Sequence, residues 1–222
     1  MAYDIPHHCS HAIVFEKAMM LVFDPITLPF TFQTRYSNAE DFWVDNCLSC
    51  GLRVGHCNNI IGNCILNKKP KYTEGQRTIE ISYPTHVIIM QIYDSSDIKI
   101  GFDDNDCLYP MRLGNIYEAG SWCYGDINLD KKDPTAIYRG FFNGIHNTDL
   151  TEFSRSDTRD YERYLESVSQ NFLSNIERTE EPIRMHYYGD VIHIQEKPRK
   201  IEYMYNREPN SVPVKGRYVI FS

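Results

Sequence analysis

The chain has 222 residues, of which 42% are hydrophobic. That allows one large domain, or one domain with extensions, and a chain of this size buries a core without needing disulfides or metals. The net charge of −7 argues against a nucleic-acid-binding protein, because contact with phosphates needs a concentrated surface of Lys and Arg. No stretch approaches the roughly 18 apolar residues of a membrane span, and the start does not read as a secretory leader.

The cysteine content indicates a reducing compartment. There are seven cysteines, an odd number, and the sequence contains no Asn-x-Ser/Thr glycosylation site. A secreted scaffold built on disulfides usually shows an even set of cysteines. We therefore expect a cytoplasmic protein with free thiols and no membrane partner.

The first half of the chain predicts strands. The run 12–23, AIVFEKAMMLVF, predicts one or two of them. The run 29–37, PFTFQTRYS, predicts another, in which Phe30, Phe32 and Thr34 lie on one face at a period of two.

Three further strand-like runs are separated by YP and by DSSD: 76–82, 85–93 and 97–102. Residues 87–90 are apolar without alternation, which predicts a strand buried on both faces. We expect 87–93 and 98–102 to be neighbouring antiparallel strands of one sheet.

A first helix is predicted after residue 133. Asp133 is a good N-cap and Pro134 a good first helical residue. Apolar residues then recur at helical spacing: Ile137, Phe141, Phe142 and Ile145. Gly140 and Gly144 either weaken this helix or let it pack closely against a neighbour.

The clearest helix is predicted over 158–179, capped by Ser156 or Asp157 and followed by Pro182. Its apolar stripe, which we expect to face the core, holds Tyr161, Tyr164, Leu165, Val168, Phe172, Leu173 and Ile176.

Three strands are predicted to close the chain, over 185–197, 199–208 and 214–222. Strands are thus segregated from two principal helices. This order predicts an α+β fold with a mainly antiparallel sheet.

Between the strands and the first helix lies an aromatic-rich loop with no helical period, LYPMRLGNIYEAGSWCYGDINL, residues 108–129. A catalytic thiol needs partial exposure and an activating neighbour. Gly114 and Gly120 allow sharp turns in this loop, and the amide of Asn115 is able to order it or to support an oxyanion near Cys123. The alternative is that Cys123 is a small hydrophobic residue of the core, as free cysteines usually are.

Asn115, Gly120 and Cys123 stand at the spacing Asn-x4-Gly-x2-Cys, and Pro134 follows eleven residues after the cysteine. This pattern resembles the active-site loop of ubiquitin-conjugating enzymes. That family has His-Pro before the Asn, where this chain has Leu113 and Gly114.

A closer resemblance is to the bacterial, plasmid-borne branch of that superfamily, the PRTRC system protein B group. It covers about residues 76–150. The positions that follow its pattern are Leu108, Tyr109, Asn115, Ile116, Tyr117, Gly120, Cys123, Gly125, Phe141, Phe142 and His146.

The resemblance implies a ubiquitin-conjugating-like core over 76–180, with a Cys-rich β or irregular segment before it (1–75) and a β extension after it (181–222). Cys123 would accept a ubiquitin-like protein from its activating enzyme as a thioester. Asn115 would order the loop or support the oxyanion, and Asp126 or Asp130 would orient the acceptor amine. The departures from the family pattern leave an inactive relative as the other outcome.

A second function class is a non-enzymatic structural component of a phage, viral or plasmid-encoded assembly, whose partners are other protein subunits. The aromatic-rich β segments at both ends of the chain, which holds 16 tyrosines, suit that role.

A third alternative is a zinc-stabilised binding module. The segment CLSCGLRVGHCNNIIGNC carries four cysteines: Cys47, Cys50, Cys57 and Cys64. The first two form a C-x2-C pair, a common half of a zinc site, but the C-x6-C remainder is not a standard second half. We therefore expect no cofactor, with this cluster as the place for zinc if one binds. Cys9 and its neighbouring histidines are candidate additional ligands.

Overall fold

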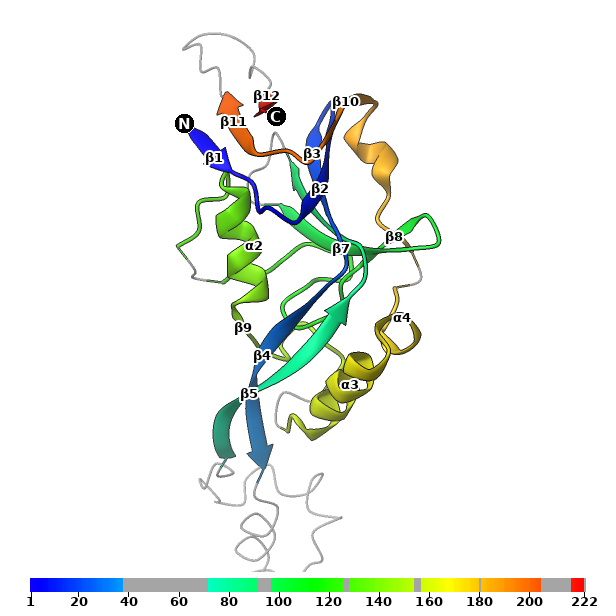
Figure 1. The fold of residues 1–222 in the computed structure, drawn as a ribbon. Coiled ribbons are helices and arrows are strands. Elements are labelled where there is room, and N and C mark those ends of the chain that lie inside the picture. Colours follow the sequence, from blue (N-terminus) through cyan, green and yellow to red (C-terminus); the bar gives the residue numbers. More distant parts are fainter. Residues whose placement is uncertain are drawn as a thin grey trace, which may run out of the picture.

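The computed structural model describes residues 1–37, 72–91, 97–125, 128–153, 157–179, 181–204 and 217–221 (Figure 1). Its strands are β1 (Ala2–Asp4), β2 (Cys9–Phe15), β3 (Ala18–Phe23), β4 (Ile26–Ser37), β5 (Tyr72–Tyr83), β6 (His86–Gln91), β7 (Ile98–Asp104), β8 (Cys107–Pro110), β9 (Ile145–His146), β10 (Val191–Glu196), β11 (Lys200–Met204) and β12 (Arg217–Phe221). Its helices are α2 (Pro134–Phe142), α3 (Arg159–Gln170), α4 (Phe172–Asn175) and the 3-10 turn η2 (Met185–Tyr188).

The centre of the fold is a six-stranded antiparallel sheet in the order β10-β2-β3-β6-β7-β8. The run 12–23, predicted to be one or two strands, forms the end of β2 and all of β3. β6 and β7 pair in antiparallel register from His86 opposite Phe102 to Met90 opposite Ile98, as expected. The end of the predicted strand, residues 92 and 93, lies outside the described residues.

Both faces of this sheet are buried in its middle, which explains the unbroken apolar run in β6. Ile88 and Met90 point into the main core. Val87 and Ile89 point the other way, into a second apolar cluster that Ile183 and Tyr188 cover. The side chains of a strand alternate between faces, so a strand with two covered faces needs apolar residues throughout.

The hairpin of β4 and β5 pairs over its full length of twelve residues and projects from the central sheet (Figure 1). Phe30, Phe32 and Thr34 are buried on one face, as the period of two predicted. The two residues of β9 add to the hairpin in parallel, His146 opposite Phe32.

Helix α2 confirms the sequence prediction at its start. The Asp133 side chain accepts a hydrogen bond from the Thr135 N–H at 2.9 Å, and Pro134 is the first helical residue. The helix stops at Phe142, however, and Ile145 is exposed in β9, so its place on the helical stripe was wrong. The backbone turns out of the helix at Asn143 and Gly144, which carry no apolar side chain to hold another turn.

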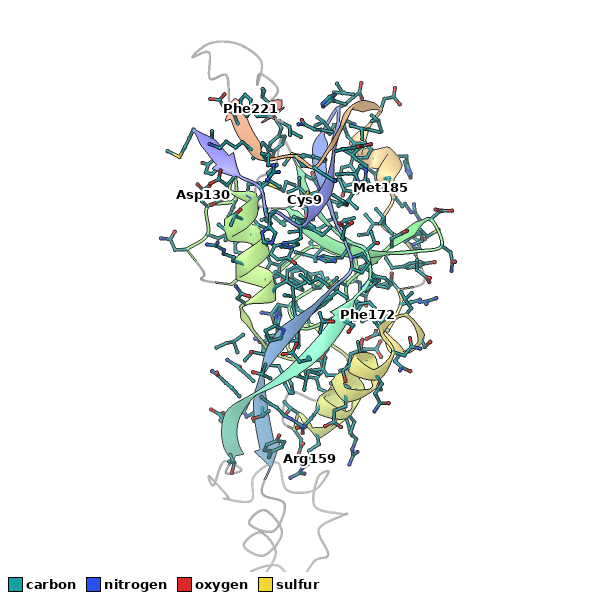
Figure 2. All side chains as sticks on the ribbon, in the orientation of Figure 1. Cys9, Asp130, Arg159, Phe172, Met185 and Phe221 are labelled. Atoms are coloured by element: carbon teal, nitrogen blue, oxygen red, sulfur yellow. The ribbon has the colours of Figure 1, made fainter. Side chains whose placement is uncertain are left out.

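The second helix is shorter than 158–179. It breaks at Asn171, whose backbone is extended (φ −154°) and whose side chain caps α4 by accepting from the Ser174 N–H. Most of the predicted stripe faces the core, including Phe172 (Figure 2). Leu173 is 38% exposed, because the break turns it away from the stripe.

Strands from all three predicted segments share sheets. β5 runs across the boundary at residues 75 and 76, β3 pairs with β6, and β10 pairs with β2. β1 from the start of the chain joins β11 and β12 from its end in a separate three-stranded sheet. The three strands predicted to close the chain correspond to β10, β11 and β12. The first of them begins later than predicted, because Met185 and its neighbours form η2.

The fold class is therefore α+β with mainly antiparallel sheets, as predicted. Within the described residues, no helix is long and apolar enough to cross a membrane.

Candidate functional site: the thiol hairpin

Residues 115–123 form a small hairpin, which we call the thiol hairpin. The Cys123 N–H donates to the Asn115 carbonyl at 2.8 Å, and the Tyr117 N–H donates to the Ser121 carbonyl at 2.9 Å. The turn closes with the Gly120 N–H on the Tyr117 carbonyl at 2.8 Å, and Gly120 has a φ of +86° that favours glycine. The Asn-x4-Gly-x2-Cys spacing thus corresponds to one tight, hydrogen-bonded turn.

The thiol hairpin extends the central sheet. The Trp122 N–H donates to the Ile98 carbonyl at 2.8 Å, and the Ile100 N–H donates to the Gly120 carbonyl at 3.0 Å. The segment around Ser121 therefore takes the place beside β7 that β8 has left. A loop that appears irregular in sequence is held by the ladder of a buried strand.

The hairpin has a buried face and an outer face. Ile116 and Trp122 are opposite one another and are 1% and 4% exposed. Their neighbours alternate to the other face, and Asn115 is opposite Cys123 there. Side chains of directly opposed residues lie about 4.5–5.5 Å apart at Cβ, so the amide and the thiol are neighbours.

Trp122 anchors the hairpin under helix α2. Its ring meets that of Phe141 edge to face, with centroids 5.8 Å apart. A Cβ on Gly140 would lie 2.9 Å from the Trp122 ring, so the glycine permits the close approach that the sequence left open. The residue before the thiol is thereby fixed in the core.

The Cys123 side chain is partly buried and lies on the outer face of the hairpin, as does Tyr117. The hydroxyl of Tyr117, on the same face of the hairpin, is hydrogen-bonded to the Cys123 thiol. This bond is the main cause of a raised Tyr117 pKa, and a charge interaction with Cys123 adds to it. Tyr117 is 48% exposed, so its side chain lies beside the sulfur without being fixed in the core.

Asn115 ties the thiol hairpin to the segment after α2. Its side-chain oxygen accepts a hydrogen bond from the Asn147 N–H at 3.1 Å. The Asn115 oxygen is thus occupied in holding the loop, which is the ordering role named from the sequence. No contact in the described residues assigns its side-chain nitrogen to an oxyanion.

His146 lies beneath this tie. Its Nε2 is 2.9 Å from the Phe141 carbonyl, and its ring stacks on Phe30 with centroids 4.3 Å apart. Burial lowers its pKa to about 4, so the ring is neutral near pH 7 and Nε2 carries the proton donated to the carbonyl. His146 is therefore a packing residue of the loop base.

A polar network flanks the turn of the hairpin. The Ser121 hydroxyl donates to the Asp97 carboxylate at 2.6 Å, and the Lys99 ammonium donates to the Ser121 hydroxyl at 3.1 Å and to the Ala119 carbonyl at 2.9 Å. These bonds fix the turn from the β7 side.

Two hollows adjoin the hairpin. One of about 410 Å³ is lined by Arg112, Tyr117, Glu118, Ala119, Leu150, Thr151 and Glu152. The other, about 680 Å³, shares Arg112, Glu118, Ala119 and Glu152 with it and continues towards Tyr187. The Arg112 guanidinium, 6% exposed, lies at their common floor and contacts Glu177 and the Ile116 carbonyl, each at 3.4 Å. A larger hollow of about 780 Å³ lies beside the β4–β5 hairpin, away from the sulfur but bordered by Asn147.

The structure describes only one of the two carboxylates named for the acceptor amine. Asp126 lies outside the described residues. Asp130 is near the start of α2 (Figure 2), where it accepts a hydrogen bond from the Lys132 N–H. Burial, followed by a hydrogen bond with Asp130, raises the pKa of Tyr3 in β1 to about 12. The contacts of Asp130 give it a structural role in that corner.

The predicted zinc cluster of Cys47, Cys50, Cys57 and Cys64 also lies outside the described residues. At the start of the chain, Cys9 is buried and donates to the His11 carbonyl, while the His8 ring packs on Phe23 and Tyr138. The described residues contain no group of three or more metal ligands.

Two residues of this site had no role in the sequence-based prediction. Tyr117 was part of the recognised pattern but had no role, although its position two residues after Asn115 would place it on the same face of a hairpin as the thiol. Asn147 could not be identified from the sequence, because its hydrogen-bond partner Asn115 lies 32 residues away along the chain.

No protein-family model, curated protein or solved structure matches the chain. The likeness of the thiol hairpin to a ubiquitin-conjugating active site therefore stays a prediction.

Proposed function

We propose that the protein is a ubiquitin-conjugating-like carrier that holds the C-terminus of a ubiquitin-like modifier as a thioester on Cys123. The observation that carries this proposal is the arrangement of the thiol hairpin. A partly exposed thiol lies on the outer face of a backbone that is bonded to β7, anchored by Trp122 and tied down through Asn115.

The rigid backbone supports acyl transfer because a nucleophile acts best when its position is fixed before the reaction. In the charging step the Cys123 sulfur attacks the carbonyl carbon of the modifier's thioester on the activating enzyme. The new C–S bond forms as the old one breaks, the enzyme's thiolate leaves, and the Cys123 proton passes to solvent or to that thiolate. In the discharging step an acceptor amine attacks the same carbon, and the new C–N bond forms as the C–S bond breaks. Cys123 leaves as the thiolate, and the proton lost by the amine passes to that thiolate or to solvent.

The hollow beside the hairpin supports an extended ligand. Tyr117 lines the 410 Å³ hollow and is hydrogen-bonded to the Cys123 thiol, so one side chain separates the hollow from the sulfur. The volume of the hollow is within the range of small ligand sites, and a narrow chain end would fit it better than a folded domain. We assign it to the last residues of the modifier.

Tyr117 acts as a cover over the sulfur in this proposal. Its hydroxyl is bonded to the thiol in the free protein, and it has to move aside when a carbonyl carbon takes that position. The side chain is half exposed, so a rotation into solvent requires no unpacking of the core.

The second candidate function is a non-enzymatic member of a larger assembly. The contact between Tyr117 and the thiol also suits this role, because a tyrosine that stayed over a partly buried sulfur would leave the hairpin as a scaffold without chemistry. The two candidates differ in whether Cys123 exchanges with a thioester.

The test uses ubiquitin whose C-terminus is a thioester of mercaptoethanesulfonate, and in parallel ubiquitin with its activating enzyme and ATP. Wild-type protein is expected to form an adduct that reducing agents cleave. Cys123→Ser should give an ester that resists reducing agents, and Cys123→Ala should give none. Cys107→Ala removes another free, exposed thiol and serves as the matched control, with an unchanged adduct.

An adduct that persists in Cys123→Ala, or that disappears in Cys107→Ala, would place the chemistry elsewhere. If the free ubiquitin thioester does not react at a well-folded wild-type protein, and a panel of ubiquitin-like thioesters also fails, the carrier proposal is wrong and the scaffold role takes its place.

A further inference from the structure

Strand β10 forms one edge of the central sheet and has an unusual surface. Within the described residues it pairs only with β2. Three of its apolar side chains are exposed: Val191 by 51%, Ile192 by 65% and Ile194 by 56%. An apolar edge strand is a template for another strand, and proteins usually protect such an edge.

The backbone of β10 offers hydrogen bonds on its outer side. The Lys197 N–H donates to the Ser10 carbonyl at 2.8 Å, which continues the register of Glu196 opposite His11 and Gln195 opposite Ala12. In an antiparallel ladder every second residue bonds to the same neighbour. The polar groups of Ile194 and Glu196 therefore point away from β2, towards an open edge.

The apolar surface of β10 continues a buried one. Ile194 is opposite Ile13, and Val191 is opposite Phe15. Phe15 belongs to the second apolar cluster, and Ile13 packs on it. β10 therefore carries the face of that cluster out to the edge of the sheet, where an added strand would extend both the ladder and the apolar face.

We propose that the occupant of this edge is β10 of a second copy of the chain, paired antiparallel about a two-fold axis. Charge favours a copy over an unrelated strand. Asp190 precedes the strand and Lys197 follows it, and neither has an ion-pair partner in the described parts of the chain. Antiparallel pairing brings the acidic end of each copy to the basic end of the other, twice, whereas parallel pairing would place like charges together.

The outward groups select the register. Residues that exchange hydrogen bonds across a new ladder both need outward-pointing groups, and Ile194 opposite its own copy satisfies this on the axis. Counted through the bulge, in which Ile192 is the extra residue, Lys197 of one copy then comes opposite Asp190 of the second copy. A two-fold axis normal to the sheet keeps the second apolar clusters of both copies on the same side.

The bulge between Val191 and His193 sets the limit of the pairing. A bulge interrupts the ladder and twists a strand, which protects part of an edge. It leaves 193–196 in regular register, so the pairing is centred where the strand is regular.

The thiol hairpin lies at the opposite end of the sheet order, beside β7. This proposal therefore does not rest on the proposed function.

The first experiment measures mass in solution by light scattering on eluting protein over a wide concentration range. Wild-type protein is expected to reach twice the 26.0 kDa of one chain. Ile194→Lys should give the single-chain mass, because a buried, symmetric pair of ammonium groups disfavours the contact. Leu173→Lys changes an exposed apolar residue on α4 and should leave the dimer intact. Circular dichroism confirms that each variant is folded.

Two further variants test the register. Ile194→Cys should form a disulfide-linked dimer under mild oxidation, because hydrogen-bonded pairs lie about 5.5 Å apart at Cα, within the range of a disulfide. Leu173→Cys and the wild type, oxidised in the same way, are the controls. Asp190→Lys and Lys197→Asp should each weaken the dimer at least tenfold in Kd, and the double exchange should restore it.

A wild-type protein that stays at the single-chain mass at every concentration overturns the proposal. So does a dimer that Ile194→Lys leaves unchanged while Ile194→Cys fails to cross-link beyond its controls, since the copies then meet through another surface.

Discussion

The ring of His146 fills the space where a side chain on Gly114 would project. A Cβ on Gly114 would lie 2.6 Å from the His146 Cβ and 2.7 Å from its Nδ1, and Gly114 has a φ of +70°. Gly114 precedes Asn115, and His146 precedes Asn147, whose N–H bonds to the Asn115 side chain. Two consecutive contacts thus join the base of the thiol hairpin to β9.

Gly114→Ala should destabilise the protein by about 2–4 kcal/mol, because it adds backbone strain and a clash with a buried ring. Chemical denaturation gives the free energy of unfolding. Gly125→Ala is the matched control: Gly125 also has a positive φ, +57°, but a Cβ there meets nothing within 4 Å. Gly125→Ala should lower the free energy of unfolding only by the backbone strain, about 1–2 kcal/mol. Equal losses for the two variants would show that His146 does not restrict Gly114.

Asn115→Ala should loosen the thiol hairpin with a modest loss of stability. The Asn147 N–H loses its acceptor, which costs about 1 kcal/mol. The rate of amide hydrogen exchange at Asn147 should rise by about tenfold or less. The rate at which iodoacetamide alkylates Cys123 should change as well. Asn115→Asp keeps the acceptor oxygen and should retain slow exchange at Asn147. Slow exchange in Asn115→Ala would mean that the amide hydrogen bond does not hold the loop.

The stability of the protein should fall as the pH decreases from about 6.5 to about 4. Burial lowers the pKa of both His86 and His146 to about 4, while an unfolded histidine titrates near 6.5. In that interval the unfolded chain binds more protons than the folded one, so protonation favours unfolding, and the full stability is present only above it. Each residue contributes up to about 1.4 kcal/mol per pH unit.

Unfolding in denaturant at several pH values measures this slope. His146→Gln and His86→Gln each remove one titrating group and keep a side-chain donor, so each should reduce the slope by up to about one proton. A slope that both variants leave unchanged would assign the acid sensitivity to the carboxylates instead.

Gly140→Ala should destabilise the protein by about 1–2 kcal/mol, although the same change in an exposed helix would stabilise it by about 1 kcal/mol. The reason is the Trp122 ring, 2.9 Å from the place of the added Cβ. With the smaller ring of Trp122→Phe present, Gly140→Ala should be less harmful, and thermal or chemical unfolding of the four proteins of this cycle gives the coupling. Additive losses would mean that the ring and the helix do not press on each other.

Local sequence patterns predicted most of the helices and strands, because the spacing of apolar residues in each one follows from which of its faces are buried. The unbroken apolar run of β6 follows from its two covered faces, and the cap at Asp133 needs only the residues next to it. The break at Asn171 was not predicted, because the apolar spacing of α3 continues through it and only the direction of the following turn shows that Leu173 faces outwards.

The candidate site could be predicted in part. The Asn-x4-Gly-x2-Cys spacing marked the turn, since a hydrogen-bonded hairpin requires a glycine with positive φ at a fixed place. The pairing of this hairpin with β7 could not be predicted. Any segment can form backbone hydrogen bonds with a strand edge, so the sequence of β7 does not specify which segment pairs with it. The Tyr117 bond to the thiol depends on that pairing, which sets both side chains on one face.

By itself the sequence determined the α+β class, the antiparallel neighbours β6 and β7, the start of α2, and Cys123 as the residue to examine. These rest on spacing within short segments, where backbone geometry alone decides which side chains share a face. Only the tertiary structure decided that Tyr117 bonds to the Cys123 thiol, that the Asn115 side chain accepts a hydrogen bond from Asn147, and that β10 exposes an apolar edge. Those features depend on contacts between distant segments, and packing of the whole chain fixes them.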